Sequence, residues 1–152
     1  MNLASLLDSS VVKIPLESAT SEEAIAELLE LLVRAGRIKD REGALEALYQ
    51  REAKGSTGIG GGVAIPHARS PEVGTLALAV GVSRAGIEFD AVDDKPVHLV
   101  FLLIAAPDKP GLNVETLADI GRLGQIAGVF QRLLSARDAS ELIRIIQEAQ
   151  LQ

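Results

Sequence analysis

One histidine follows a glycine-rich stretch near the middle of the 152-residue chain. Residues 55–62 hold five glycines together with the hydroxyls of Ser56 and Thr57, and His67 follows the segment Val63-Ala64-Ile65-Pro66. An unperturbed imidazole has a pKa of about 6.5, so much of it is neutral at pH 7 and a ring nitrogen can attack phosphorus. Backbone N–H groups of a glycine-rich turn can bind phosphoryl oxygens, because the missing Cβ allows close approach. The stretch therefore indicates covalent handling of a phosphoryl group.

The segments on either side determine how this histidine is presented. Pro66 restricts its own φ angle and favours an extended Ile65, which predicts that His67 is held stiffly at the end of a strand. A helix is expected to begin after Asp40 and to stop before the first glycine, which places Arg51 in its last turn. There Arg51 can complement the helix C-terminus or reach a phosphoryl group next to the loop, and both explanations stay open.

Each part of this stretch also has a simpler explanation. A glycine-rich loop alone is usually a connection, and an isolated histidine at a strand end is usually a surface or hydrogen-bonded residue. The second histidine, His98, begins an apolar run without an acidic neighbour, and we interpret it as structural. Nucleotide binding is less well supported, because the loop lacks Gly-Lys-Ser/Thr and follows a helix. No metal-ligand set and no Gly-x-Ser-x-Gly hydrolase elbow can be recognised.

Composition narrows the class of protein further. The chain is 47% hydrophobic but only 3% aromatic, so an aliphatic core is expected. Its net charge of −6 argues against nucleic acid as a partner, because phosphates attract a basic surface. No apolar run approaches the roughly 20 residues of a membrane span, and no signal peptide is recognisable. We expect a cytoplasmic protein without direct membrane insertion, cofactor or bound metal.

The spacing of apolar residues alternates between helical and strand-like segments. The run from Val97 to Ala105 is almost wholly aliphatic, which predicts a central strand covered on both faces. Arg84-Ala85-Gly86 is expected to form a turn. Helices at both ends around a group of strands predict one α/β domain over residues 1–152, with a mixed sheet. Helices are expected after Thr20, after Asp40, from about Asn113 and after Asp138, and strands at 11–15, 76–82 and 97–105.

The glycine-rich window also resembles a known phosphorylation site. Glu52 is followed by six residues, Ile59-Gly60, two residues, and then Val63-Ala64-Ile65-Pro66-His67-Ala68. This order is similar to the pattern in enzyme IIA (EIIA) components of the sugar phosphotransferase system, in the fructose/mannitol/nitrogen-regulatory class (type 2). The likeness extends from about residue 5 to residue 148. Because the sequence indicates a single unattached domain, we expect the nitrogen-regulatory type. It implies an α/β/α sandwich.

The resemblance also implies roles for particular residues and partners. His67 would accept a phosphoryl group from a histidine-containing phosphocarrier protein, and Arg51, Ser56, Thr57 and Asn113 would bind its oxygens. The acceptor would be a downstream sugar-transport component or a regulatory target protein. Asn113 stands where many relatives carry a second histidine, and its amide can donate a hydrogen bond but cannot carry a positive charge.

Two hypotheses of different classes follow. In the first, the chain is a phosphotransferase component that works through phosphohistidine, for nitrogen-type regulation or for sugar transport. In the second, it is a non-catalytic EIIA-like interaction module whose relay is weakened at Asn113. Binding of a partner that persists in His67→Ala, without any phosphohistidine, would favour the second.

Overall fold

The aliphatic run becomes strand β6 (Val97–Ala105), which lies at the centre of the sheet in the computed structural model. The structure describes residues 2–151. Strand β6 pairs antiparallel with β5 (Leu76–Ile87) and parallel with both β3 (Val63–Ala64) and β4 (His67–Arg69). All of its residues except His98 are buried, so the predicted central strand is confirmed. The sheet order is β1-β5-β6-β3-β2, with β1 at Val12–Lys13 and β2 at Gly58–Gly60.

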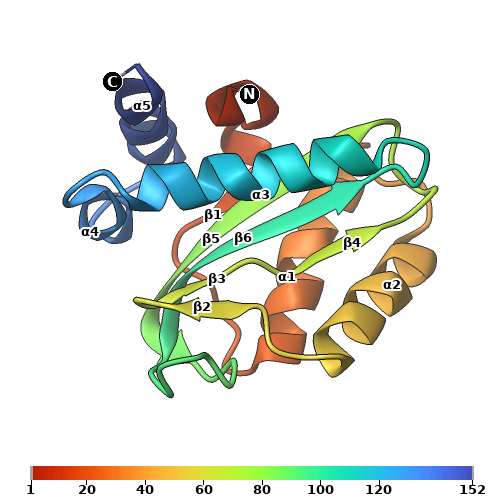
Figure 1. Cartoon of the computed structure of the whole chain (residues 1–152), viewed down its shortest axis with the longest axis horizontal. Coiled ribbons are helices and arrows are strands. Elements are labelled where there is room, and N and C mark those ends of the chain that lie inside the picture. The colour runs from red at the N-terminus through yellow and green to blue at the C-terminus, as the bar shows by residue number, and fades with distance from the viewer. Residues whose placement is uncertain (1, 152) are drawn as a thin grey trace.

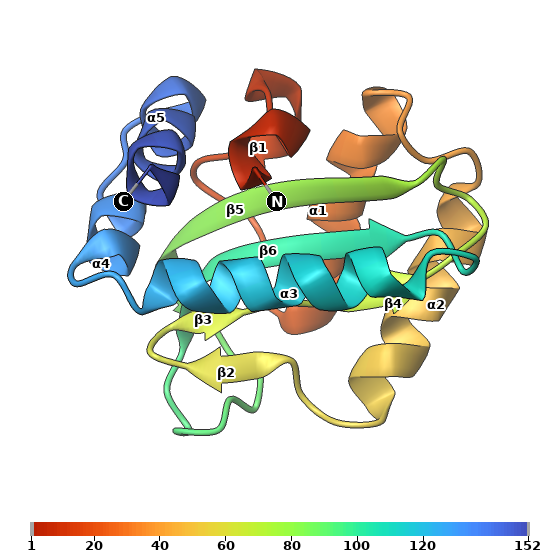
Figure 2. The same cartoon turned by 45° about the horizontal axis from the view of Figure 1, so that its top comes forward.

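Helices cover the sheet on both sides (Figures 1 and 2). Helix α1 (Ser21–Arg34) packs on β5, and α2 (Arg41–Ala53) packs on α1 and on β4. Helix α3 (Pro110–Gly124) crosses the opposite face over β6, followed by α4 (Val129–Leu134). Helix α5 (Ala139–Gln150) packs on α4 and on the N-terminal 3₁₀ turn Leu3–Leu6. A second 3₁₀ turn, Ser9–Val11, leads into β1. The expected α/β/α sandwich with a mixed sheet is confirmed.

Local signals in the sequence explain where three helices begin. Thr20 accepts a hydrogen bond from the backbone of Glu23, whose carboxylate in turn accepts from the backbone of Thr20, and the two bonds form a capping box at the expected start of α1. Asp40 caps α2, and Asp138 caps α5. Each carboxylate satisfies a backbone N–H that the first turn of a helix leaves without a partner.

Two expectations about element boundaries were wrong. Helix α3 begins at Pro110 rather than near Asn113, because proline suits the first turn of a helix, where the backbone N–H has no helical partner. Asn113 therefore lies inside that first turn and is not its N-cap. Strand β5 continues through residues 84–86 instead of turning there; its register with β6 shifts between Val82 and Ile87, and Gly86 takes a positive φ of 92°. The irregularity is absorbed as a bulge.

The segment that carries His67 lies at one end of this sheet. Strands β4 and β6 run parallel and end together, with His67 opposite Leu103 and Arg69 opposite Ala105. The chain then leaves β6 and enters α3, whose first turn comes close to β4, while the C-terminal half of α2 lies on the other side (Figure 2). Within residues 2–151, none of the helices has both the length and the apolar character that a bilayer span requires.

Candidate functional site

His67 is the first residue of β4, and its ring is held by the main chain. Its Nδ1 lies 2.7 Å from the carbonyl oxygen of Ile65. A carbonyl oxygen can only accept, so Nδ1 carries the proton in the neutral ring and Nε2 keeps its lone pair. Pro66, between the two residues, keeps the backbone extended. The side chain is half-buried, and the hydrogen bond at Nδ1 sets the orientation of the ring and leaves Nε2 as the nitrogen with a lone pair.

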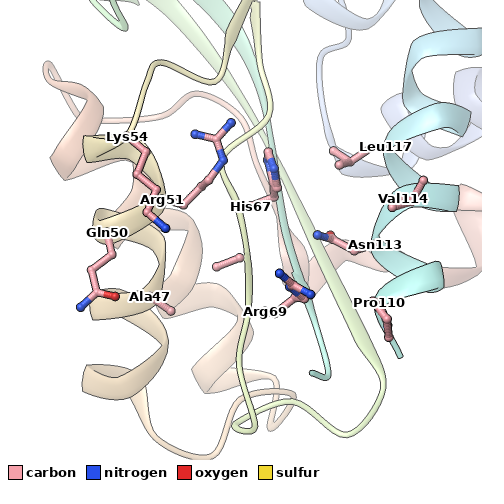
Figure 3. Close-up of a pocket in the computed structure, with 11 residues that line it drawn as sticks. Ala47, Gln50, Arg51, Lys54, His67, Arg69, Pro110, Asn113, Val114 and Leu117 are labelled. Carbon is pink, nitrogen blue, oxygen red and sulfur yellow. The ribbon is translucent and has the colours of Figure 1, made fainter. Parts of the chain in front are cut away.

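The ring lines an open cleft of about 520 Å³ between α2 and α3. Figure 3 shows His67 between the two helices, with α2 on one side and α3 on the other. Strand β4 forms the floor, and each helix supplies one wall. The lining residues are Ala47, Gln50, Arg51 and Lys54 from the α2 side, His67, Ala68 and Arg69 from β4, and Pro110, Asn113, Val114 and Leu117 from α3.

The charge of this cleft is opposite to that of the chain. Arg51, Lys54 and Arg69 line it, and no aspartate or glutamate among the described residues does. The whole chain has 21 acidic residues against 15 basic ones, and many of its other cations form ion pairs. Within residues 2–151, none of these three cations forms a salt bridge. The arrangement leaves positive charge available to an anion beside His67.

The position of Arg51 is compatible with both roles that the sequence left open. Its Nη1 donates a 2.9 Å hydrogen bond to the carbonyl oxygen of Gly55, which lies just beyond the C-terminus of α2. The same guanidinium lines the cleft (Figure 3). A guanidinium has five N–H donors, so this bond leaves donors for a ligand.

Asn113 enters the cleft from the first turn of α3. Figure 3 shows its amide extending from the helix toward His67. Its Oδ1 is buried and has no hydrogen-bond partner within the described part of the chain. An unpaired buried acceptor of this kind costs about 1–3 kcal/mol. Because Oδ1 only accepts hydrogen bonds, it cannot bind an anion, and only the Nδ2 donors of this amide suit one.

Ser56 and Thr57, also expected at the site, do not line the cleft. The Ser56 hydroxyl donates to the carbonyl oxygen of Phe89 and accepts from the backbone N–H of Gly58 at 3.0 Å. Thr57 is only 4% exposed; its backbone N–H and its hydroxyl both donate to the Glu52 carboxylate, at 2.9 and 2.7 Å. Both hydroxyls therefore order the segment between α2 and β2.

Comparison with known proteins assigns the family. The family model for "Phosphoenolpyruvate-dependent sugar phosphotransferase system, EIIA 2" matches residues 5–149. The chain belongs to the EIIA 2 family. It is 38% identical over 130 residues to the fructose-specific EIIA component of Haloferax volcanii, covering 86% of this chain and 84% of that protein. It is 34% identical over 148 residues to the fructose-specific EIIABC component of Bacillus subtilis, covering 97% of this chain but only 23% of that longer protein.

Structural comparison agrees with this assignment. The nitrogen regulatory protein IIA-Ntr of Neisseria meningitidis superposes with a TM-score of 0.82 at 29% identity, covering 95% of this chain and 98% of that one. Both fructose-specific and nitrogen-regulatory proteins are therefore similar to this EIIA 2 chain. The resemblance inferred from the Glu52-to-Ala68 pattern is confirmed at the level of the family.

The three consecutive glycines of this EIIA 2 chain are not a phosphate cradle around His67. Gly60, Gly61 and Gly62 all take positive φ; Gly60 ends β2, and Gly61 and Gly62 form the turn to β3, which Figure 2 shows at the end of the sheet away from α2. Strand β3 begins opposite Leu99 and β4 opposite Leu103, a difference of about 13 Å along β6. The N–H of Gly61 already donates, at 3.0 Å, to the carboxylate of Asp93.

Several cleft residues of the EIIA 2 fold were not singled out from the sequence. Lys54 lies three residues after Arg51, a spacing that places both on one side of a helix, so the signal was present. For Gln50 and Leu117, no sequence pattern indicated that they would line the cleft. His98, interpreted as structural, is half-buried, hydrogen-bonded through Nδ1 to the carbonyl of Ser83 and outside the cleft. Within residues 2–151, no group of three or more His, Cys, Asp or Glu side chains is arranged to hold a metal ion.

Proposed function

We propose that this chain is a phosphocarrier that accepts a phosphoryl group on Nε2 of His67. The observation that carries the proposal is the cleft itself. A histidine with a fixed ring is surrounded by Arg51, Lys54 and Arg69, without a carboxylate among the described lining residues, in a chain of net charge −6. Positive charge concentrated at one nucleophile in an acidic protein suits transfer of an anionic group.

The proposed step needs little covalent chemistry from the protein. The Nε2 lone pair of His67 attacks phosphorus, the new N–P bond forms, and the bond to the donor's nitrogen breaks with its electron pair returning to the donor. The proton on Nδ1 stays in its hydrogen bond to Ile65, and the carbonyl oxygen stabilises the positive charge on the phosphorylated ring. Transfer to an acceptor reverses these events. Positioning and fixed donors therefore supply the catalysis.

Arg51 and Asn113 are the proposed phosphoryl ligands from the two walls. The guanidinium of Arg51 offers charge and paired donors, which suit the oxygens of a phosphoryl group. The amide of Asn113 offers a neutral donor from α3. Ser56 and Thr57 support the site indirectly, since Thr57 binds Glu52 and so ties the last turn of α2 to β2.

The proposed partners follow from the family. The donor is a histidine-containing phosphocarrier protein, and the exchange takes place in the cytoplasm. The relative from B. subtilis is named as an EIIABC component, so in that protein an EIIA unit is part of a longer sugar-transport chain. The acceptor here is a downstream sugar-transport component or, by analogy with the nitrogen regulatory relative, a regulatory target protein.

Phosphorylation from a purified relay tests the proposal. The protein is mixed with phosphoenolpyruvate, the first enzyme of the relay and the phosphocarrier protein, and the product is read by intact mass. We expect one acid-labile phosphoryl group on the wild type and on His98→Ala, and none on His67→Ala. His98→Ala is the matched control because it removes the other histidine of the chain.

Two outcomes would contradict the proposal. A label that persists in His67→Ala would place the phosphoryl group elsewhere. No label on the wild type, with a two-histidine relative labelled fully in parallel, would favour the interaction module instead. That alternative predicts that partner binding is unchanged in His67→Ala.

A further inference from the structure

Arg69 shares the face of β4 that carries the nucleophile. Side chains alternate along a strand, so residues 67 and 69 point to one side and Ala68 to the other. Burial follows this alternation: Ala68 is buried, at 8% exposure, whereas His67 is half-buried and Arg69 is exposed. The two Cα atoms are about 7 Å apart along the strand. An arginine side chain can therefore place its guanidinium beside a group bound to Nε2 of His67.

The two walls of the cleft differ in charge. The α2 wall holds Arg51 and Lys54, whereas the α3 wall consists of the uncharged residues Pro110, Asn113, Val114 and Leu117. Figure 3 shows Arg69 on the same side of the β4 ribbon as His67, next to Asn113. Among the described lining residues, the positively charged side chain beside α3 is therefore that of Arg69, on the floor of the cleft.

The guanidinium of Arg69 has no intramolecular partner among the described residues. It forms no salt bridge within the described part of the chain, whereas Arg122, Arg132 and Arg137 each pair with a carboxylate. Within residues 2–151 no hydrogen bond engages its guanidinium either. Its five N–H donors are available, and a guanidinium matches the geometry of phosphoryl oxygens with two parallel hydrogen bonds.

We propose that Arg69 binds the phosphoryl group on His67 from the α3 side and supplies there the positive charge that the amide of Asn113 cannot carry. This inference rests on the proposed function. Charge spreads over the equatorial oxygens in the transition state, so a second guanidinium opposite Arg51 stabilises it from both sides of the ring. Arg69 is thus a ligand of the transferred group, in addition to any effect on partner approach.

Kinetic measurements separate binding of the phosphoryl group from an effect on the approach of the partner. Phosphorylation of Arg69→Gln, Arg69→Lys, Lys54→Gln and Lys95→Gln is measured against the concentration of phosphorylated phosphocarrier protein. Lys95 is the matched control, because it is exposed and lies in the loop between β5 and β6, away from the cleft. Melting temperatures establish that each variant is folded.

A ligand of the phosphoryl group affects the maximal rate. We expect Arg69→Gln to lower it about tenfold to a hundredfold, the range for loss of a hydrogen bond to a charged group. Arg69→Lys should fall between Arg69→Gln and the wild type, because lysine keeps the charge but loses the paired geometry. Lys54→Gln should mainly raise the half-saturating phosphocarrier concentration, and Lys95→Gln should match the wild type.

Other results overturn the inference and are distinct from failure of the proposed function. If Arg69→Gln keeps the wild-type maximal rate and changes only half-saturation, Arg69 serves docking alone. If it changes neither, Arg69 has no role in transfer. If Arg69→Lys is as slow as Arg69→Gln, charge is not what Arg69 supplies. Absence of label on the wild type would instead contradict the proposed function.

Discussion

Replacing Thr57 with valine is expected to loosen the connection between α2 and the site. In the wild type, Glu52 accepts from the backbone N–H of Thr57 at 2.9 Å and from its hydroxyl at 2.7 Å. Valine has nearly the same shape but lacks the hydroxyl, so one of the two bonds is lost. Because Glu52 follows Arg51 in the last turn of α2, the change acts next to a proposed phosphoryl ligand.

The expected loss of stability follows from the charge and the burial of the hydrogen-bond acceptor, Glu52. A hydrogen bond to a charged group contributes about 1.5–3 kcal/mol to stability. Glu52 is only half-buried and keeps its second bond, so we expect the lower end, about 1.5 kcal/mol. In a domain of this length each kcal/mol lowers the melting temperature by about 2–4 °C, which predicts a decrease of about 3–6 °C.

Thermal and urea unfolding measure this difference. Thr57→Ser is the matched control, since it keeps the hydroxyl and removes one methyl group, whose burial contributes about 0.8 kcal/mol. A double-mutant cycle with Glu52→Gln isolates the pair: removal of the Thr57 hydroxyl should matter less once the carboxylate is gone.

Two results would refute this reasoning. Thr57→Val as stable as the wild type would mean that the hydroxyl contributes nothing to the fold. Effects of Thr57→Val and Glu52→Gln that simply add would mean that the two side chains are not coupled, whatever their separation.

Three further changes test other parts of the structure. Asn113→His should raise the maximal transfer rate, most clearly below about pH 6.5 where an ordinary imidazole is charged; equal rates of labelling at all pH values would contradict this. Hydrogen bonds from the backbone N–H of Gly61, foremost, and of Lys95 lower the pKa of Asp93 below its ordinary 3.8. The stabilisation by the Asp93 carboxylate is present above that ordinary value and is lost as pH falls through the lowered pKa. Asp93→Asn should therefore melt at a lower temperature than the wild type near neutral pH, and the difference in melting temperature should disappear in acid. Gly58→Ala would place a Cβ 2.9 Å from the backbone Cα of Ala91 and should destabilise by about 1–3 kcal/mol; an unchanged urea midpoint would contradict this.

Much of the fold could be predicted because local signals and the global arrangement agree. The aliphatic run at residues 97–105 is buried on both faces, as only a central strand requires. The capping residues Thr20, Asp40 and Asp138 each mark a helix start. The start of α3 was misplaced because asparagine is a common N-cap, while Pro110 fits the first turn equally well.

The candidate site was predicted less completely, for a physical reason. His67 and Arg51 lie near the glycine-rich stretch in sequence, and both line the cleft. The glycines themselves do not, because β3 carries the chain away from the turn before β4 begins. Ser56 and Thr57 instead form hydrogen bonds with other residues of the chain, Ser56 with Phe89 and Gly58 and Thr57 with Glu52. A list of nearby polar residues therefore overestimates which side chains meet in space.

The cleft is assembled from three parts of the chain that are distant in sequence: the end of α2, strand β4 and the first turn of α3. A compact, partly folded chain can keep its helices without docking them, and then the nucleophile has no surrounding charges. If His67 is the phosphoryl acceptor, the fraction of chains that become phosphorylated would therefore report the fraction with complete tertiary packing. During refolding, such a chemical label would separate the native state from collapsed forms that helical spectroscopy alone does not distinguish.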